Sequence, residues 1–126
     1  MKQATDTEVS KSVLVVDDEQ NFLALLRWFL TDRGYEVQTA LSGEDALKLV
    51  EANSFDLALV DIRMGPVDGL SLLDELKRRT PLIQVIMMTA YPTVGAIKQS
   101  HEKGASAFLT KPVDLQQLSN TINGLL

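Results

Sequence analysis

The sequence predicts an α/β domain built on a doubly wound, five-stranded parallel sheet with the strand order 2-1-3-4-5. A short apolar run, a turn and an amphipathic stretch follow one another five times along the 126 residues. The apolar run Leu57–Val60 ends abruptly in Asp61, which is typical of a strand buried on both faces of a parallel sheet. Connections of this length between parallel strands are right-handed crossovers, and they place helices on both faces of the sheet.

Composition indicates one globular domain without a membrane segment. The chain is 45% hydrophobic and 23% charged, and no apolar run approaches the roughly 20 residues that span a bilayer. A net charge of −5 disfavours direct contact with nucleic acid, because phosphate backbones reward clustered Lys and Arg. The absence of cysteine excludes disulfides and thiolate metal sites and suits a reducing cytoplasm. The polar residues 1–10 are predicted to be a flexible leader before one domain over residues 11–126.

The first repeat unit begins with the apolar run Val13–Val16, which stops at three acidic residues. The following helix is expected to bury one stripe with the spacing i, i+3, i+4, i+7. That stripe consists of Phe22, Leu25, Leu26 and Phe29. Trp28 falls off the stripe and is expected at the flank of the core. Gly34 is placed to end this helix, and residues 35–39 alternate as a more exposed strand does.

The middle units are marked by a capping signal and by the central strand. Ser42 and Asp45 have the spacing of a capping box at the start of the second helix. The third strand ends at Asp61, and a Gly/Pro loop at residues 64–67 leads into the third helix. The inward side chains of that helix are predicted to be Leu70, Leu73 and Leu76.

The last two units contain a helix with few apolar residues and a short strand. Leu82–Met88 is predicted as the fourth strand, and the helix after it has a thin inward stripe of Val94 and Ile97. Residues 107–109 form the short fifth strand, and Asp114 is the expected N-cap of the last helix. Because the fourth helix buries so little, we expect it to be the most easily displaced element.

Polar side chains follow four of the five strands at the point where each strand ends. Asp17 and Asp18 follow the first strand, Asp61 the third, Thr89 the fourth and Lys111 the fifth. Taken singly, each could be a helix cap, a loop residue or a solvated charge. Because the carboxyl ends of parallel strands meet at one edge of the sheet, we expect these side chains to converge on a ligand site.

Three carboxylates at one edge favour a bound cation and a phosphoryl group. Their mutual repulsion and desolvation raise their pKa values, and Mg²⁺, which prefers oxygen ligands, relieves this. A carboxylate can attack a phosphoryl donor and hold the group as an acyl phosphate. A metal and a lysine beside the transferred group lower the barrier by electrostatics and positioning. The arrangement therefore predicts Asp61 as a nucleophile in phosphoryl transfer, assisted by Mg²⁺ and Lys111.

In order and spacing, these motifs resemble the receiver domain of two-component response regulators over residues 11–126. The matching pieces are Val15–Glu19, Val60–Met64, Asp68–Gly69, Met88–Ala90 and Phe108–Pro112. The stretches 89–92 and 103–112 are most similar to receivers attached to transcriptional activators of the nitrogen-regulation type. The resemblance implies a flavodoxin-like (βα)₅ fold and a domain that is switched by phosphoryl transfer from a sensor histidine kinase.

The resemblance also implies a metal site and a phosphoacceptor. Asp61 would accept the phosphoryl group. Mg²⁺ would be held directly by Asp18, Asp61 and the backbone carbonyl of Arg63, with Asp17 acting through water.

It further implies the parts of a switch. Lys111 would pair with the phosphoryl oxygens, and its peptide bond to Pro112 would be cis. Thr89 would hydrogen-bond the bound phosphate, and the small Ala90 would leave room for it. Phe108 would then turn inward and repack the surface formed by the fourth helix, the fifth strand and the fifth helix.

Two bulky side chains are expected to flank the phosphoryl group. Arg63 and Tyr91 each lie two residues beyond a site residue, and we hypothesise that they restrict water and set the lifetime of the acyl phosphate. The loop after Met64 departs from the family, which usually has proline at the next position, whereas here Gly65 precedes Pro66. Glycine frees φ and proline fixes it, so the turn of this loop is less predictable than the role of Asp61.

Other functions fit less well. Aspartate-nucleophile phosphohydrolases of the haloacid-dehalogenase group have the motif Asp-x-Asp after the first strand, with the nucleophile first. Here Asp17 and Asp18 are adjacent, and the isolated Asp61 follows the third strand. A nucleotide-binding domain would need a Gly-rich phosphate loop after the first strand. A phosphate-independent interaction module would not need the acidic residues, Thr89 and Lys111 together. The domain is therefore expected to catalyse only its own phosphorylation and dephosphorylation, and not to be an enzyme in the usual sense.

The expected partners follow from the resemblance. They are a sensor histidine kinase, an effector domain that could follow Leu126, and a second copy on phosphorylation. No contact with nucleic acid or a membrane is expected from this domain, and a cytoplasmic location is expected.

Overall fold

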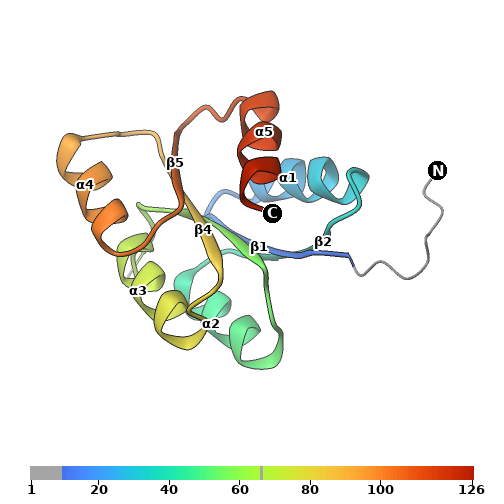
Figure 1. Ribbon diagram of the computed structural model, residues 1–126, viewed down its shortest axis with the longest axis horizontal. Coiled ribbons are helices and arrows are strands. Elements are labelled where there is room, and N and C mark those ends of the chain that lie inside the picture. The colour runs from blue at the N-terminus through green and yellow to red at the C-terminus, as the bar shows by residue number, and fades with distance from the viewer. Residues whose placement is uncertain (1–9, 66) are drawn as a thin grey trace.

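The computed structural model describes residues 10–65 and 67–126, and it has five strands alternating with five helices (Figure 1). All strand pairs are parallel and the sheet order is β2-β1-β3-β4-β5, which confirms the predicted fold class. The strands are β1 Ser12–Val16, β2 Glu36–Ala40, β3 Leu57–Asp61, β4 Gln84–Thr89 and β5 Ala107–Thr110. The helices are α1 Gln20–Asp32, α2 Gly43–Ala52, α3 Gly69–Arg79, α4 Val94–Glu102 and α5 Leu115–Leu125. Pro66 and residues 1–9 of the expected leader lie outside the described residues.

The core consists of two apolar layers, one on each face of the sheet. Side chains alternate along a strand, so Leu57 and Leu59 of β3 pack with α1 and α5, while Ala58 and Val60 pack with α2 and α3. Figure 1 shows α1 and α5 together on one side of the sheet, with α2 and α3 on the other. All four of these β3 side chains are fully buried, and Asp61 at the end of the strand is buried as well.

Side-chain caps set the starts of four helices. Ser42 Oγ accepts a hydrogen bond of 3.1 Å from the Asp45 N–H, as the capping signal predicted. Asp68, Thr93 and Asp114 cap α3, α4 and α5 in the same way. The turn after α1 passes through Gly34 at a φ of +93°, a conformation that favours glycine, so this predicted helix end is also confirmed.

The inner stripe predicted for α1 was partly wrong. Its buried residues are Leu23, Leu26, Phe29 and Leu30, whereas Leu25 is 43% exposed. Trp28, expected at the flank of the core, is 63% exposed. Leucines on adjacent positions make more than one stripe possible, and contact with the sheet selects the one that contains Leu23 and Leu30. Strand β4 also begins later than predicted, at Gln84, and Leu82 is 90% exposed.

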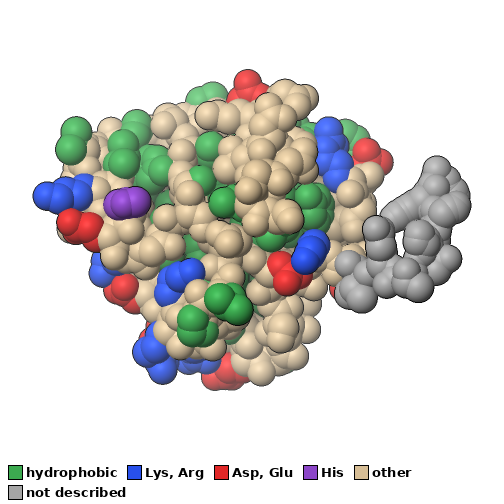
Figure 2. Space-filling model, viewed as in Figure 1, with side chains coloured by type: hydrophobic (Ala, Val, Ile, Leu, Met, Phe, Trp, Pro, Cys, Tyr) green, Lys and Arg blue, Asp and Glu red, His purple; other side chains and the backbone are tan. Residues whose placement is uncertain are grey.

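Helix α4 buries few side chains against the rest of the domain. The two residues predicted to face inward, Val94 and Ile97, are exposed instead. Val94 is 83% exposed and Ile97 is 44% exposed, and the buried residue that the structure records in this helix is Ser100. Figure 2 shows hydrophobic side chains at the surface over α4, beside the single histidine. The expectation of a weakly buried helix is therefore confirmed, with its apolar residues on the solvent side.

The loop between β3 and α3 brings the first turn of α3 against the end of β3. A Cβ placed on Gly69 would lie 2.2 Å from the backbone oxygen of Asp61 and 2.6 Å from the Cα of Ile62. The Gly69 N–H donates a hydrogen bond of 2.9 Å to the carbonyl of Ile62. Only glycine allows this approach, which holds the backbone at Asp61 in place. Within the described part of the chain, no helix is long and apolar enough to cross a membrane.

Candidate functional site

The carboxyl-terminal edge of the sheet gathers four of the polar residues that the sequence singled out. Asp17 follows β1, Asp61 ends β3 and Thr89 ends β4, and all three are buried in the structure. Lys111 follows β5 at the same edge, and its backbone N–H donates a hydrogen bond of 2.8 Å to the Thr89 carbonyl. Asp18 lies beside them with an exposed side chain. Parallel pairing therefore brings these side chains together, as expected.

Lys111 joins the two buried carboxylates. Its Nζ lies 2.5 Å from Asp17 Oδ2 and 3.4 Å from Asp61 Oδ2. The same ammonium lies 4.7 Å from the centre of the Phe22 ring, which covers one side of it. The cation is thus held by two acids and an aromatic face at the point where the strand ends converge.

Asp61 lies in a setting that resists ionisation. Burial is the largest effect and raises the pKa of its carboxyl, and the charge of Asp17 raises that pKa further. The Lys111 ammonium and the Arg63 N–H, which donates to Asp61 Oδ1 at 3.2 Å, act in the opposite direction. At Lys111, partial burial lowers the pKa, but the carboxylates of Asp17 and Asp61 outweigh it and raise the pKa overall. Lys111 therefore stays charged beside a carboxyl group whose ionisation is disfavoured by burial.

Asp61→Asn is expected to stabilise the metal-free domain at neutral pH. Because the folded-state pKa of Asp61 lies above its ordinary value of 3.8, the folded chain holds this proton over a pH range in which the unfolded chain has lost it. The contribution of the Asp61 carboxyl to the free energy of unfolding therefore falls as pH rises through that range. Asparagine does not ionise, so the variant does not lose this stability. Urea unfolding in EDTA should show the advantage of the variant growing with pH. A variant less stable than the parent at neutral pH would contradict this.

Three acidic residues cluster at this edge of the sheet. Carboxylate oxygens of Asp17, Asp18 and Asp61 lie within 4.8 Å of one another. Hard oxygen donors in this number suit Mg²⁺, which keeps several waters and takes few protein ligands. Asp17 is held more closely than Asp61, because its oxygens accept from the Glu19 N–H at 2.9 Å and from Lys111 at 2.5 Å, whereas those of Asp61 accept at 3.2 and 3.4 Å. The donor set therefore fits a hard divalent cation.

The other residues predicted for the site make contacts of their own. Thr89 Oγ1 accepts a hydrogen bond of 3.1 Å from the Tyr91 N–H. The Arg63 guanidinium lies over the Tyr91 ring at 4.8 Å from its centre, so the two expected flanking side chains touch. The Lys111–Pro112 peptide bond is cis, as expected. Phe108 is half-buried on the side of the sheet that carries α2 and α3.

The protein-family model described as "Response regulator receiver domain" matches residues 13–123 of this chain. This chain belongs to the response regulator receiver family.

Curated relatives of this receiver domain include transcriptional regulators. It is 39% identical over 114 residues to the transcriptional regulatory protein ZraR of Salmonella typhimurium, covering 90% of this chain and 26% of ZraR. It is 37% identical to the transcriptional regulatory protein GlrR of Escherichia coli, with the same coverage of 90% and 26%. The chain thus spans about a quarter of the length of these relatives. The resemblance to receivers of transcriptional activators is confirmed.

Solved structures show the same fold and, in two cases, ligands. A CheY-like receiver domain protein from Methanospirillum hungatei superposes with a TM-score of 0.89 at 32% identity, covering 92% of this chain and 93% of its own. TrrA from Thermotoga maritima, crystallised in complex with Mg²⁺–BeF, has a TM-score of 0.83 at 34% identity, covering 92% and 99% of the chains. A Burkholderia pseudomallei response regulator has a TM-score of 0.84 at 32% identity, covering 89% and 66% of the chains, and holds a phosphorylated aspartic acid and a calcium ion.

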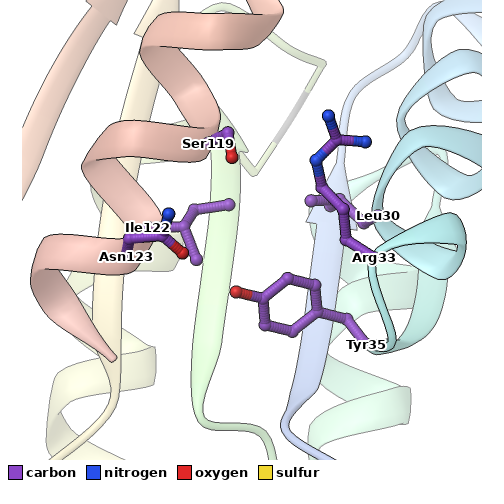
Figure 3. A pocket seen from close by; sticks show the side chains of 6 residues that line it. All are labelled: Leu30, Arg33, Tyr35, Ser119, Ile122 and Asn123. Carbon is purple, nitrogen blue, oxygen red and sulfur yellow. The ribbon is translucent and has the colours of Figure 1, made fainter. Parts of the chain in front are cut away.

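One pocket of the receiver domain lies away from the acidic site. A pocket of about 200 Å³ lies between α5 and the turn that joins α1 to β2 (Figure 3). The Tyr35 ring and the Arg33 side chain enter it from the α1 side, facing Ile122 and Asn123 of α5. None of these residues follows the carboxyl end of a strand, so the pocket is separate from the acidic site.

Sequence reasoning missed two contacts that support the site. The stacking of Lys111 on Phe22 joins residues that are 89 positions apart, so no local pattern signals it. The contact between Arg63 and Tyr91 was missed too, although both were expected near the phosphoryl group.

Proposed function

We propose that this receiver domain takes a phosphoryl group onto Asp61 from a sensor histidine kinase, and that the group changes the α4–β5–α5 surface. One observation carries the proposal: a buried aspartate at the end of the central strand lies 3.4 Å from a lysine ammonium and beside two further acids. The neighbouring Burkholderia pseudomallei structure, with its phosphorylated aspartic acid, supports the same chemistry here. The domain would catalyse only its own phosphorylation and dephosphorylation.

Mg²⁺ is the proposed cofactor. Asp18, Asp61 and the backbone carbonyl of Arg63 would hold it, with Asp17 acting through water, since the hydrogen bonds to the Asp17 oxygens, at 2.9 and 2.5 Å, are shorter than those to Asp61, at 3.2 and 3.4 Å. When bound, the ion would neutralise charge on the carboxylates and on the incoming phosphoryl oxygens. The Mg²⁺ complex of TrrA supports this choice, and the calcium ion in the Burkholderia pseudomallei regulator supports a hard divalent cation at such a site.

The chain's own residues would guide the transfer. A carboxylate oxygen of Asp61 attacks phosphorus, the bond from phosphorus to the donor histidine nitrogen breaks, and an acyl phosphate forms. Lys111 Nζ, within hydrogen-bond reach of Asp61, stabilises the spread negative charge of the transferred group. Ala90 is small and exposed, so it leaves the approach to Asp61 open.

The same contacts would make the domain a switch. Phosphorylation adds about −1.5 to −2 charges to a site that already contains three acids. Thr89 Oγ1 and Lys111 Nζ are the available donors, so the ends of β4 and β5 would be drawn toward the phosphate. Half-buried Phe108 on β5 would then turn inward, and thinly anchored α4 would move with little cost.

The wider context is also a proposal. The transcriptional regulators among the relatives support an effector domain beyond Leu126, a cytoplasmic location and control of transcription through that second domain. The exposed apolar residues of α4 support a homodimer formed through the α4–β5–α5 surface on phosphorylation.

Incubation with acetyl phosphate and Mg²⁺, followed by intact mass measurement, tests the proposal. The domain should gain one phosphoryl group that is stable in acid and labile in base, and EDTA should prevent this. A phosphohydrolase would instead turn over many equivalents without retaining the group. A phosphate-independent interaction module would gain nothing, and either of these two outcomes would refute the proposal.

Arg63→Ala combined with Tyr91→Ala is expected to shorten the life of the acyl phosphate. The two side chains stack on each other, and each follows a site residue by two positions, so together they would limit the approach of water to phosphorus. Loss of phosphate from pre-labelled protein, followed by mass spectrometry, should be several-fold faster in the double variant. An unchanged rate would remove any role of this pair in setting the lifetime.

A further inference from the structure

The outward side of α1 carries an apolar stripe that the receiver site does not use. The helix buries Leu23, Leu26, Phe29 and Leu30 against the sheet. On its opposite side, Ala24, Trp28 and Thr31 follow one another at i, i+4 and i+7, and we call these three residues the outer stripe. Trp28 is 63% exposed, so the largest side chain of the stripe stands in solvent.

Two opposite charges border the outer stripe. A shallow hollow of about 470 Å³ is lined by the outer stripe together with Arg27 and Asp32. At about 100° per residue, Arg27 lies on one side of the outer stripe and Asp32 on the other. Within the described chain neither of them forms an ion pair. Arg33, by contrast, lies on the flank of α1 that faces α5 (Figure 3). Its guanidinium stacks on Phe29, 3.7 Å from the centre of the ring.

We propose that the outer stripe is a self-association surface, on which α1 of one copy packs parallel to α1 of a second copy. The stripe and its borders follow a heptad, with Ala24 and Thr31 at d, Trp28 at a, Arg27 at g and Asp32 at e. In a parallel helix pair, position g faces position e five residues later on the other helix. Arg27 of each copy would therefore face Asp32 of the other, as a two-fold interface requires.

The charges select this orientation. In an antiparallel pair, the g side faces the g side and the e side faces the e side, so Arg27 would face Arg27 and Asp32 would face Asp32. In the parallel pair both contacts join opposite charges. The small side chains of Ala24 and Thr31 leave room for the two Trp28 rings between the helices.

The position of the outer stripe leaves the acidic site free. Helix α1 begins at Gln20, next to the acidic residues, and Trp28 lies about 12 Å further along it, toward the other end of the helix. The outer stripe also contains no residue of α4, β5 or α5, the elements of the proposed switch. Two turns of one helix bury much less than the ~1,200 Å² of a stable interface, so association is weak. Because the outer stripe lies apart from the proposed switch, association should not depend on phosphorylation.

Sedimentation velocity on the 126-residue chain, at concentrations up to about 1 mM, tests this. The parent should self-associate, and the emission of Trp28, the only tryptophan, should shift to shorter wavelength as it does so. Trp28→Ala should abolish association. Arg27→Glu and Asp32→Arg should each weaken it about tenfold or more, because each replaces two attractive contacts with repulsive ones.

The decisive arm mixes the two charge variants. In an Arg27→Glu chain paired with an Asp32→Arg chain, both contacts again join an acid and a base, so association should return to within about threefold of the parent. Lys48→Glu replaces an exposed lysine of α2 and makes the same change of charge as Arg27→Glu. It is the matched control and should not change association. Labelling by acetyl phosphate should be the same in all these variants, which separates this proposal from that for Asp61.

Three outcomes would overturn the proposal. They are a parent that stays monomeric over the whole range, a mixture that associates no better than its components, and association that survives Trp28→Ala. A monomeric parent whose Trp28→Ala variant receives phosphate more slowly from a histidine kinase would assign the outer stripe to the kinase instead.

Discussion

Lys111→Met is expected to slow phosphorylation of Asp61 by about 100-fold, the usual effect of removing one preorganised charge from a transition state. Its Nζ lies 2.5 Å from Asp17 and 3.4 Å from Asp61, so it is already in place before the phosphoryl group arrives. Methionine preserves much of the contact with Phe22 but supplies no charge. The rate of labelling by acetyl phosphate, measured by intact mass at saturating Mg²⁺, reports the effect.

The matched control for this variant is Lys48→Met, which removes an exposed lysine of α2 away from the site. It should label at the rate of the parent. A Lys111→Met rate within twofold of the parent would mean that the ammonium only neutralises the buried acids and does not assist the transfer.

Gly69→Ala is expected to destabilise the fold by about 1–3 kcal/mol, as inserting a methyl group into close packing usually does. The new Cβ would lie 2.2 Å from the Asp61 backbone oxygen, so either the first turn of α3 or the end of β3 must shift. Because that shift moves the phosphoacceptor itself, the rate of labelling should fall together with stability. Urea denaturation and acetyl phosphate labelling of the same preparation measure the two effects.

Gly124→Ala is the control with the opposite sign. Gly124 lies in the last turn of α5, and a Cβ there meets nothing within 4 Å. Alanine should therefore leave stability unchanged or raise it by up to about 1 kcal/mol. If Gly69→Ala were as stable as Gly124→Ala, the close approach of α3 to β3 would not constrain the phosphoacceptor.

The sequence predicted the fold and the convergence of the acidic site because both depend on strand ends. An apolar run that stops at Asp61 is visible in the sequence, and parallel pairing then brings it to the same edge as Asp17 and Thr89. Caps such as Ser42 are equally local, since donor and acceptor lie within one helical turn.

The orientation of the helices was harder to predict. Leucines at adjacent positions in α1 allow more than one inward stripe, and only contact with the sheet excludes Leu25 from the core. In α4 the apolar residues Val94 and Ile97 fit an inward stripe by spacing, yet they lie on the solvent side. Burial of Ser100 in their place depends on neighbouring elements, which a local pattern does not contain.

The most direct test of the central claim is to locate the phosphoryl group. Borohydride reduces an acyl phosphate to a primary alcohol with release of phosphate, so treatment of the labelled domain marks the acceptor residue, which peptide mass spectrometry can identify. The account predicts the mark at Asp61 alone and no mark in Asp61→Asn. A mark at Asp17 or Asp18, or labelling that persists in Asp61→Asn, would contradict it.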